Sequence, residues 1–235
     1  MLSTQPEIAA NRLLAVMPRR DLRRFLAGCE TVDLVFAQVL IEPGDPIRHV
    51  YFPTRGFISL IKPLNRHASL EVGMVGDEGM LGAPLILGVD VSPLHAVVQG
   101  PGPALRMDAA TFQRELGLTP ALEQALKRYL YVVMDQFAQT ATCARFHVVE
   151  ARLARWLLMT HDRAHADVFH VTHEFLAHML GVRRVGVTKA ASALQRRQLI
   201  RYNRGEVAIL DRAGLEVAAC ACYEADNASY ARIMV

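Results

Sequence analysis

Residues 172–210 read THEFLAHMLGVRRVGVTKAASALQRRQLIRYNRGEVAIL, and this stretch decides the fold of the C-terminal part of the chain. The eight residues after Thr172 predict a short helix, for which the Thr172 hydroxyl is a suitable N-cap. Gly181 follows as a tight turn, and the apolar periodicity predicts a second helix from Arg183 to about Arg197. Two helices joined by a short glycine-containing turn are typical of a helix-turn-helix.

The second predicted helix has one apolar face and one polar face. Its apolar face packs on the domain core and consists of Val187, Ala190, Ala191 and Leu194. Arg184, Thr188 and Lys189 lie outward in its N-terminal half, which in a recognition helix meets base edges in the major groove. Gly186 permits a close approach either of the backbone to a phosphate or of a neighbouring helix.

A β-hairpin is predicted directly after this helix, from residues 199–202 and 207–210 joined at Asn203-Arg204-Gly205. It has the place of a wing, so Arg201 and Arg204 are expected to touch the phosphate backbone. Between residues 183 and 204 the chain carries seven basic side chains and no acidic one. The net charge of the whole chain is only +3, and such a local cluster indicates a surface for a polyanion.

The composition excludes several classes of protein. With 235 residues, 52% of them apolar, and ordinary glycine and proline content, the chain is a globular protein of one or two domains. Neither an apolar stretch of transmembrane length nor a secretory signal is apparent, so a cytoplasmic location is expected. Four cysteines are too few for a disulfide framework and should remain reduced there.

The N-terminal part of the chain differs from the C-terminal part in the spacing of its apolar residues. Residues 6–28 predict a helical lead-in that breaks at Pro18. Short apolar runs bounded by Gly/Pro turns then predict strands of a sandwich or jelly roll. These runs are 31–36, 50–52, 57–61, 70–75, 95–99 and 104–107.

Helical periodicity returns after Asp108. A long helix is predicted from Thr119-Pro120 to about Arg145, and its apolar residues suit either a core helix of one domain or a central helix that also packs on a second copy. A further helix is predicted over 148–159, with Trp156 as a core anchor. The polar segment 161–169 predicts a loop.

This organisation resembles the Crp/Fnr family of bacterial transcription regulators. The resemblance is carried by Leu180 to Lys189 with Leu194, Leu199 and Ile200, and by the preceding segment 145–158. It implies an α+β fold with an N-terminal double-stranded β-helix (a jelly-roll, cyclic-nucleotide-binding-like domain) in 1–117, a dimerisation helix in 118–145 and a C-terminal winged helix-turn-helix in 146–235. A homodimer bound to double-stranded DNA is implied, with RNA polymerase as a further partner and a hinge around 142–147.

The resemblance also assigns roles to individual residues. It implies that Arg184 and Lys189 read bases and that Arg183 and Thr188 lie close to phosphates. Val185 departs from the pattern, since the family has an acidic residue there that accepts a hydrogen bond from cytosine. A shifted half-site, with Val185 on a thymine methyl group, is expected instead.

The effector is less well defined than the DNA contacts. Family members that bind cyclic AMP carry a phosphate cassette, whose first half is similar to residues 76–82 and whose second half corresponds to residues 92–97. The resemblance therefore implies an effector pocket at Glu78, Gly79, Met80, Leu81, Gly82 and His95. The arginine of the second half is missing, and a buried phosphate needs a fixed cation. Cyclic AMP is therefore disfavoured, although a small-molecule effector of unknown identity is still expected.

Metal and cofactor motifs are weak. Cys29 alone precedes Cys143, which disfavours the iron–sulfur cluster of oxygen-sensing members. Cys220-Ala221-Cys222 would place its thiols about 200° apart on a helix, unlike a metal knuckle. His161 and His165 have a spacing that could bind zinc on a helix, but a third ligand is missing. Haem binding by His49, His67 or His95 remains an open alternative. No metal site or catalytic residue is therefore predicted.

Two other classes of function compete with a DNA-binding regulator. One is a cupin-like, metal-dependent β-roll enzyme with an appended helical domain, which would need histidine ligands on adjacent strands. The other is an interaction module whose DNA-binding domain is vestigial. A steep fall of DNA affinity with salt separates a regulator from both.

Overall fold

The computed structural model describes residues 11–65 and 68–234. The chain forms two compact units, of which the first contains residues up to 59 together with 74–131, and the second contains 60–73 and 132–233. Within the described residues, none of the helices combines the length and the apolar character that crossing a membrane requires.

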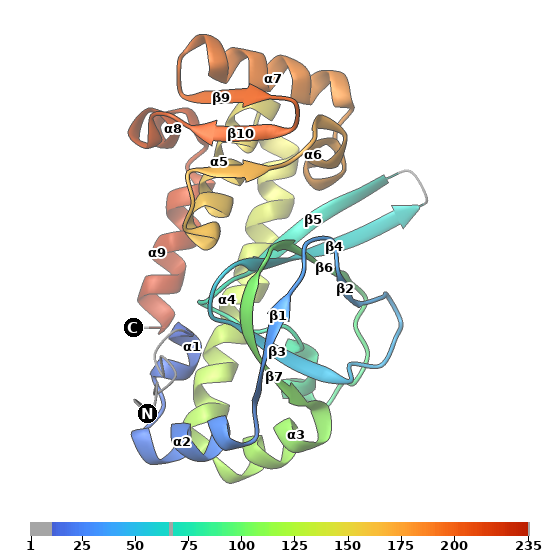
Figure 1. The fold of residues 1–235 in the computed structure, drawn as a ribbon, viewed down its shortest axis with the longest axis vertical. Helices are drawn as coiled ribbons and strands as arrows, with labels where there is room; N and C mark the ends of the chain where they lie inside the picture. Colours follow the sequence, from blue (N-terminus) through green and yellow to red (C-terminus); the bar gives the residue numbers. More distant parts are fainter. Residues whose placement is uncertain (1–10, 66–67, 235) are drawn as a thin grey trace, which may run out of the picture. The chain divides into compact units, whose positions relative to one another are not determined.

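The first unit is built on the strands of a β-roll (Figure 1). One sheet has the order β1-β7-β3 and is antiparallel throughout, and a second has the order β2-β6-β4-β5. The strands are β1 (Glu30–Leu34), β2 (Val39–Ile41), β3 (His49–Pro53), β4 (Phe57–Asn65), β5 (Ala68–Val75), β6 (His95–Gly100) and β7 (Gly102–Asp108), with a 3-10 helix η1 (Ala83–Leu87) between β5 and β6. All six predicted strands are confirmed. β2 has no predicted counterpart, because three residues are too few to show a period.

Short helices pack on the β1-β7-β3 sheet through aromatic residues. The ring of Phe25, on α2 (Arg19–Ala27), meets Phe52 edge-on at 5.5 Å between centroids, and Phe52 in turn lies 6.5 Å from Phe112 on α3 (Ala109–Leu118). α1 (Arg12–Ala15) precedes α2 and ends before Pro18, as predicted. The first part of the predicted lead-in, residues 6–10, lies outside the described residues.

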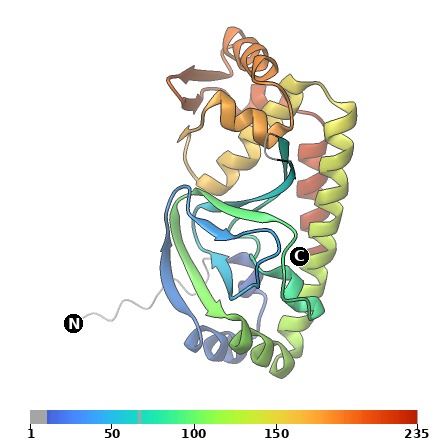
Figure 2. The same cartoon turned by 90° about the vertical axis from the view of Figure 1, so that its right-hand side faces the viewer.

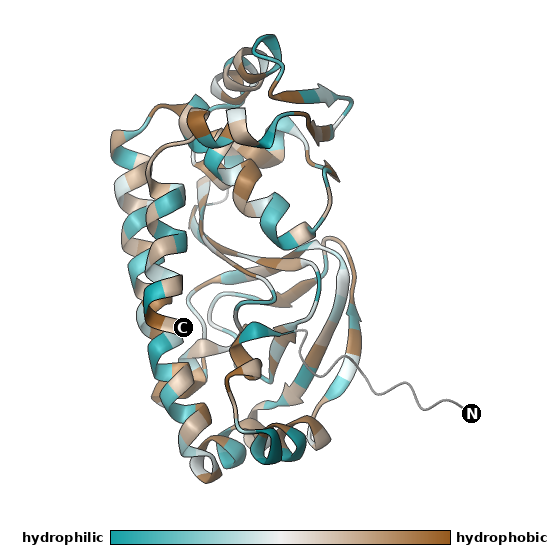
Figure 3. Cartoon of the chain, turned by 90° about the vertical axis from the view of Figure 1, so that its left-hand side faces the viewer, coloured by the Kyte–Doolittle hydropathy of each residue, from teal (hydrophilic) through white to brown (hydrophobic). Residues whose placement is uncertain are grey.

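The long helix α4 (Pro120–Phe146) confirms the predicted helix to within one residue at each end. Proline suits its first position because the missing N–H would have no helical partner there. Hydrophilic and hydrophobic residues alternate along its ribbon (Figure 3). Its buried residues include Leu122, Ala125, Leu126, Tyr129, Val132 and Val133.

The second unit contains a three-stranded antiparallel sheet and five further helices (Figure 1). The sheet has the order β8-β10-β9. Its elements are α5 (Val149–Ala164), β8 (Val168–His170), α6 (His173–Leu180), α7 (Arg184–Arg196), β9 (Ile200–Asn203), β10 (Glu206–Ile209), α8 (Arg212–Ala218) and α9 (Cys222–Met234). The fold is therefore α+β, with a β-roll, a long helix and a winged helix-turn-helix.

The predicted loop over 161–169 is wrong at both ends. α5 continues to Ala164, because the polar side chain of His161 is held by Asp167 Oδ1 at 2.7 Å and by Arg212 Nη1. β8 is a strand because it pairs with β10 and not because of its own composition. Both features depend on contacts that are remote in sequence and have no local period.

α9 runs alongside the C-terminal half of α4 (Figure 2). Ser229 Oγ donates a hydrogen bond to Asp135 Oδ2 at 2.6 Å, which joins these two helices. Arg155 on α5 makes a buried ion pair with Asp226 on α9. The second unit therefore packs its last helix against two earlier ones.

Candidate nucleic-acid interface

The helix-turn-helix forms with the predicted caps. Thr172 Oγ1 accepts a hydrogen bond from the Phe175 amide at 3.1 Å, which caps the start of α6. Gly181 ends α6 with φ +61°, a left-handed conformation that glycine adopts without a steric penalty. α7 then begins at Arg184, two residues beyond Val182. Local sequence thus sets the N-cap of α6 and the turn that follows it.

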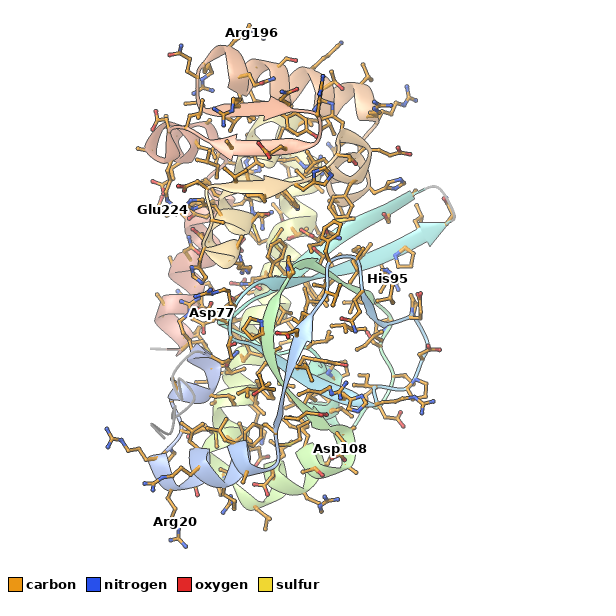
Figure 4. All side chains as sticks on the ribbon, viewed as in Figure 1. Arg20, Asp77, His95, Asp108, Arg196 and Glu224 are labelled. Atoms are coloured by element: carbon orange, nitrogen blue, oxygen red, sulfur yellow. The ribbon has the colours of Figure 1, made fainter. Side chains whose placement is uncertain are left out.

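α7 places its two faces as predicted. Val187, Ala190, Ala191 and Leu194 are at most 5% exposed and pack on the core of the unit. Arg183, Arg184, Val185, Thr188 and Lys189 are all exposed to solvent. Val185 is 60% exposed, which is unusual for valine and leaves its methyl groups free to contact a partner. Arg196, at the far end of α7, points away from the ribbon (Figure 4).

A contact between α6, α7 and the wing orients the recognition helix. His173 Nδ1 lies 3.0 Å from Thr188 Oγ1, and this hydroxyl also donates to the Arg184 carbonyl at 3.1 Å. The His173 ring stacks on Tyr202 with 4.4 Å between centroids, and the Tyr202 hydroxyl donates to the Val171 carbonyl at 2.6 Å. Burial, together with the charge of Arg184, lowers the pKa of His173. The sequence gives no signal for this group, because stacking depends on tertiary placement.

The wing is a tight two-residue hairpin. β9 and β10 pair in a register that sets Asn203 opposite Glu206, which leaves Arg204 and Gly205 as the turn. Both have positive φ, +49° and +84°, as a type I′ turn requires. Arg201 and Arg204 are exposed on this hairpin. They have the position from which a wing touches phosphates.

Not every basic residue of the segment is free to meet DNA. Arg197 Nη1 pairs with Glu150 Oε1 at 3.1 Å, which ties the end of α7 to α5. The candidate interface therefore consists of the exposed predicted residues at the start of α7 and on the wing, namely Arg183, Arg184, Val185, Thr188, Lys189, Arg201 and Arg204.

A cleft of about 640 Å³ lies beside the start of α7. One side of it is formed by the hairpin residues Leu64 and Ala68–Leu70, and the other by α6, the turn and Arg183-Arg184. Ser69 Oγ donates to the His178 carbonyl at 3.5 Å, and Trp156 Nε1 donates to Glu71 Oε1 at 2.9 Å. Residues 60–73, which contain most of the β4–β5 hairpin, thus belong to the unit that carries the recognition helix, whereas the outer ends of β4 and β5 belong to the first unit.

The predicted effector residues are packed into the first unit. Glu78 accepts a hydrogen bond from the Gly76 amide at 3.3 Å and lies 3.9 Å from the Arg12 guanidinium. Met80 and Leu81 are 1% and 5% exposed. A side chain at position 79 or 82 would collide with Tyr129 or Val50, respectively, so both glycines permit close packing. His95, labelled in Figure 4, lies 2.9 Å from Glu42 Oε2.

Among the candidate metal ligands, the structure brings together a group that the sequence does not predict. Cys143, His147, Cys220 and Cys222 place one ligand atom each within 4.8 Å of one another. The angle of about 200° expected between Cys220 and Cys222 on a helix does not apply, because α9 begins only at Cys222 and Cys220 lies in the preceding turn. For haem, His49 packs edge-on against Tyr51, and His67 lies outside the described residues.

Comparisons with known proteins agree with the geometry of the second unit. The family model described as Crp-like helix-turn-helix domain matches residues 151–218. A curated relative, the transcriptional regulator SdrP of Thermus thermophilus, is 25% identical over 198 residues, which are 80% of this chain and 93% of the relative.

Solved structures share the fold at low identity. FixK2 from Bradyrhizobium japonicum has a TM-score of 0.68 at 13% identity, over 82% of this chain and 98% of FixK2. A putative transcriptional regulator of the Crp/Fnr family from Eubacterium rectale has a TM-score of 0.69 at 14% identity, over 89% of this chain and 98% of the regulator.

Proposed function

The chain belongs to the Crp/Fnr family of transcription regulators, and from this premise we propose how its residues bind DNA. In this proposal α7 enters the major groove, Arg184 and Lys189 read base edges, and Arg183 and Thr188 contact phosphates. Val185 contacts a thymine methyl group, since an apolar side chain cannot accept a hydrogen bond from cytosine. Arg201 and Arg204 on the wing contact the adjacent backbone.

The observation that carries the proposal is the division of α7 into two faces. The predicted apolar residues are buried and the predicted contact residues are exposed, on a helix that starts from a glycine turn. His173, which stacks on Tyr202, also contacts Thr188 on α7 and so helps to hold the helix in place. This arrangement presents cations on a rigid element, which suits hydrogen bonding to guanine. The matching family model and the curated relative are both transcription regulators, and neither supports a cupin-like enzyme, so that alternative is set aside.

We propose further that two copies act together through α4. Tyr131 and Met134 are 50% and 57% exposed on this helix, and Ala138 and Ala141 continue the exposed apolar row at heptad spacing. Such a row supports a parallel helix pair between subunits. Two recognition helices about 34 Å apart would then read a near-palindrome in cytoplasmic DNA, where RNA polymerase is a further partner.

The signal input is also a proposal. The β4–β5 hairpin continues from the β-roll strands into the second unit, where Glu71 accepts a hydrogen bond from Trp156. A ligand contacting residues 78–82 or His95 would act through this hairpin and the hinge at 142–147, in a shift between two dimer arrangements. Mass spectrometry of small molecules released from the purified protein tests for such a ligand.

The DNA-binding proposal is tested by mobility shifts on genomic fragments at several salt concentrations. Replacing both Arg184 and Lys189 by alanine should abolish the preference for a bound fragment, with each lost base contact costing about 1–3 kcal/mol. The Arg20→Ala variant, which removes an exposed charge from α2, is the matched control. An unchanged preference in the double variant overturns the base-reading role of α7.

A further inference from the structure

Three thiols and an imidazole converge in the second unit, at the end of α4 and the start of α9. Cys143 and His147 are four residues apart, and the His147 amide still donates to the Cys143 carbonyl at 3.2 Å, so one helical turn sets both side chains on the same side. Cys220 and Cys222 arrive from the turn before α9. Cys143, Cys220 and Cys222 are 2%, 8% and 2% exposed.

The distances within this group match the edges of a small tetrahedron. The Sγ atoms of Cys143 and Cys220 are 3.5 Å apart, and Cys222 Sγ is 3.5 Å from His147 Nδ1. With a zinc–sulfur bond of about 2.3 Å, tetrahedral geometry puts two sulfur ligands about 3.8 Å apart. All four ligand atoms lie within 4.8 Å of one another. A single ion at their centre would need only small shifts of the side chains.

We propose that Cys143, His147, Cys220 and Cys222 bind one thiophilic metal ion, with Zn²⁺ as the best fit. Three thiolates and one imidazole form a closed Cys₃His set, which is typical of structural zinc. Four protein ligands leave no open position for substrate. The site is separate from the DNA contacts and from the proposed effector segment.

The surroundings of the group suit thiolate ligands. Gln139 Nε2 donates a hydrogen bond to Cys222 Sγ at 2.8 Å, and such outer contacts orient metal-bound cysteines. Arg152 and Arg155 line the same small cavity as Cys143, and Arg155 is also paired with Asp226. Positive charge beside three thiolates offsets the net negative charge that the bound ion would leave.

The geometry favours a single ion over the other chemistries open to clustered cysteines. An iron–sulfur cluster places several irons and sulfides between its ligands, so its cysteine sulfurs stand farther apart than those around one ion. A Cys143–Cys220 disulfide would use two of the thiols and leave Cys222 and His147 without a role. The cytoplasm also keeps such thiols reduced.

An ion at this position would join two segments that are remote in sequence. It would link the end of α4, where the proposed hinge lies, to the turn between α8 and α9. This turn follows the wing in the chain, with α8 between them. Zinc in such a site contributes directly to folding free energy. The ion would therefore set the stiffness of the hinge that the proposed regulation bends.

Metal content and cobalt spectroscopy of the full-length protein test the site. The protein is purified without chelator under reducing conditions, and zinc is measured by mass spectrometry per chain. The expected result is about one zinc per chain. After zinc is exchanged for Co²⁺, the wild-type protein should show thiolate-to-cobalt charge transfer and the intense ligand-field bands of a tetrahedral site.

The zinc affinities of single-residue variants distinguish metal ligands from residues that do not bind the ion. Cys222→Ser and His147→Ala should weaken Zn²⁺ at least about 100-fold in competition with a chromogenic chelator, whereas Gln139→Ala, which alters only an outer contact, should weaken it about 10-fold to 100-fold. Cys29→Ser is the matched control, because Cys29 lies in the first unit and should leave zinc content unchanged.

Two kinds of result, on metal binding and on the oxidation state of the thiols, would overturn the proposal, and both are measured on the wild-type protein. One is wild-type protein that binds neither Zn²⁺ nor Co²⁺ after reduction and reconstitution, or that gives an octahedral Co²⁺ spectrum. The other is freshly isolated protein with a Cys143–Cys220 disulfide and no metal. DNA binding is measured separately, so failure of the metal site leaves the proposed DNA contacts standing.

Discussion

The Arg155 guanidinium lies 2.6 Å from the Asp226 carboxylate, and both side chains are less than 10% exposed. This buried ion pair joins α5, which leads into the helix-turn-helix, to α9, which packs along α4. Burial raises the pKa of Asp226 against the opposing effect of Arg155. A buried pair is costly to break, because the remaining charge has no water to solvate it.

Removing one partner of this pair should destabilise the second unit strongly. For Asp226→Ala the free energy of unfolding should fall by about 3–5 kcal/mol, because Arg155 remains buried without its partner. Urea denaturation followed by the fluorescence of Trp156, the single tryptophan, measures this. Glu224→Ala, an exposed acid on the same helix, is the control and should change stability by under about 0.5 kcal/mol. Equal effects of the two substitutions would contradict the role of the pair.

A second prediction concerns sequence preference. Val185→Glu restores an acid at a position that faces outward from α7, and a carboxylate accepts a hydrogen bond from cytosine N4. The preferred base at one position of each half-site should therefore change to cytosine. Selection of bound duplexes from a randomised half-site measures this. Val217→Glu, at another strongly exposed valine, serves as the control, and identical preferences in both variants would refute the contact.

The wing should supply affinity without sequence information. Replacing Arg201 and Arg204 by alanine should weaken binding to all duplexes alike and reduce the slope of log K against log salt by about 2. Fluorescence anisotropy at several salt concentrations measures the slope. Arg20→Ala should leave it unchanged. A wing variant that loses preference for one sequence while keeping its salt slope would show that the wing reads bases instead.

His173 should make the second unit sensitive to acid. The pKa of His173 is lowered in the folded state, whereas in the unfolded chain it has its ordinary value of about 6.5. The unfolded chain therefore takes up a proton more readily than the folded one. The unfolding free energy should therefore decrease as the pH falls through this range, since the unfolded state then binds more protons. Denaturant titrations between about pH 7.5 and about pH 5.5 measure the change.

The matched pair for this prediction is His173→Asn and His178→Gln, two changes on the same helix. The first should flatten the pH dependence and the second should preserve it, because His178 is exposed. If both variants retain the wild-type slope, the stacked histidine is not the responsible group.

The sequence predicts those parts of the fold that rest on local periodicity. α6 and its Thr172 cap, the buried and exposed faces of α7, and the wing hairpin all follow from residues near one another in the chain. The hairpin turn is one residue shorter than the predicted Asn203-Arg204-Gly205, because Asn203 pairs with Glu206. β8 does not, because three residues form a strand only where β10 supplies the partner. For the same reason the end of α5 extends beyond the predicted helix.

The candidate sites differ in the same way. The proposed DNA contacts lie at the start of one helix and on one hairpin, so the local sequence pattern and the family resemblance together predict them. The proposed metal ligands come from two segments, and Cys143 and Cys220 are 77 residues apart. Two sequence signals could have suggested the site, namely the helical spacing of Cys143 and His147 and the Cys-x-Cys pair, but neither gives four ligands alone. Only the packing of α9 beside α4 brings them together.

The most direct test of the account is selection of duplexes by the purified protein from a random library, repeated with Arg184→Ala. The account predicts a near-palindrome for the wild-type chain, with half-sites about one helical turn, roughly 34 Å, apart, and loss of one specified base per half-site for the variant. Enrichment of no sequence, or of the same sequence by both proteins, would contradict it.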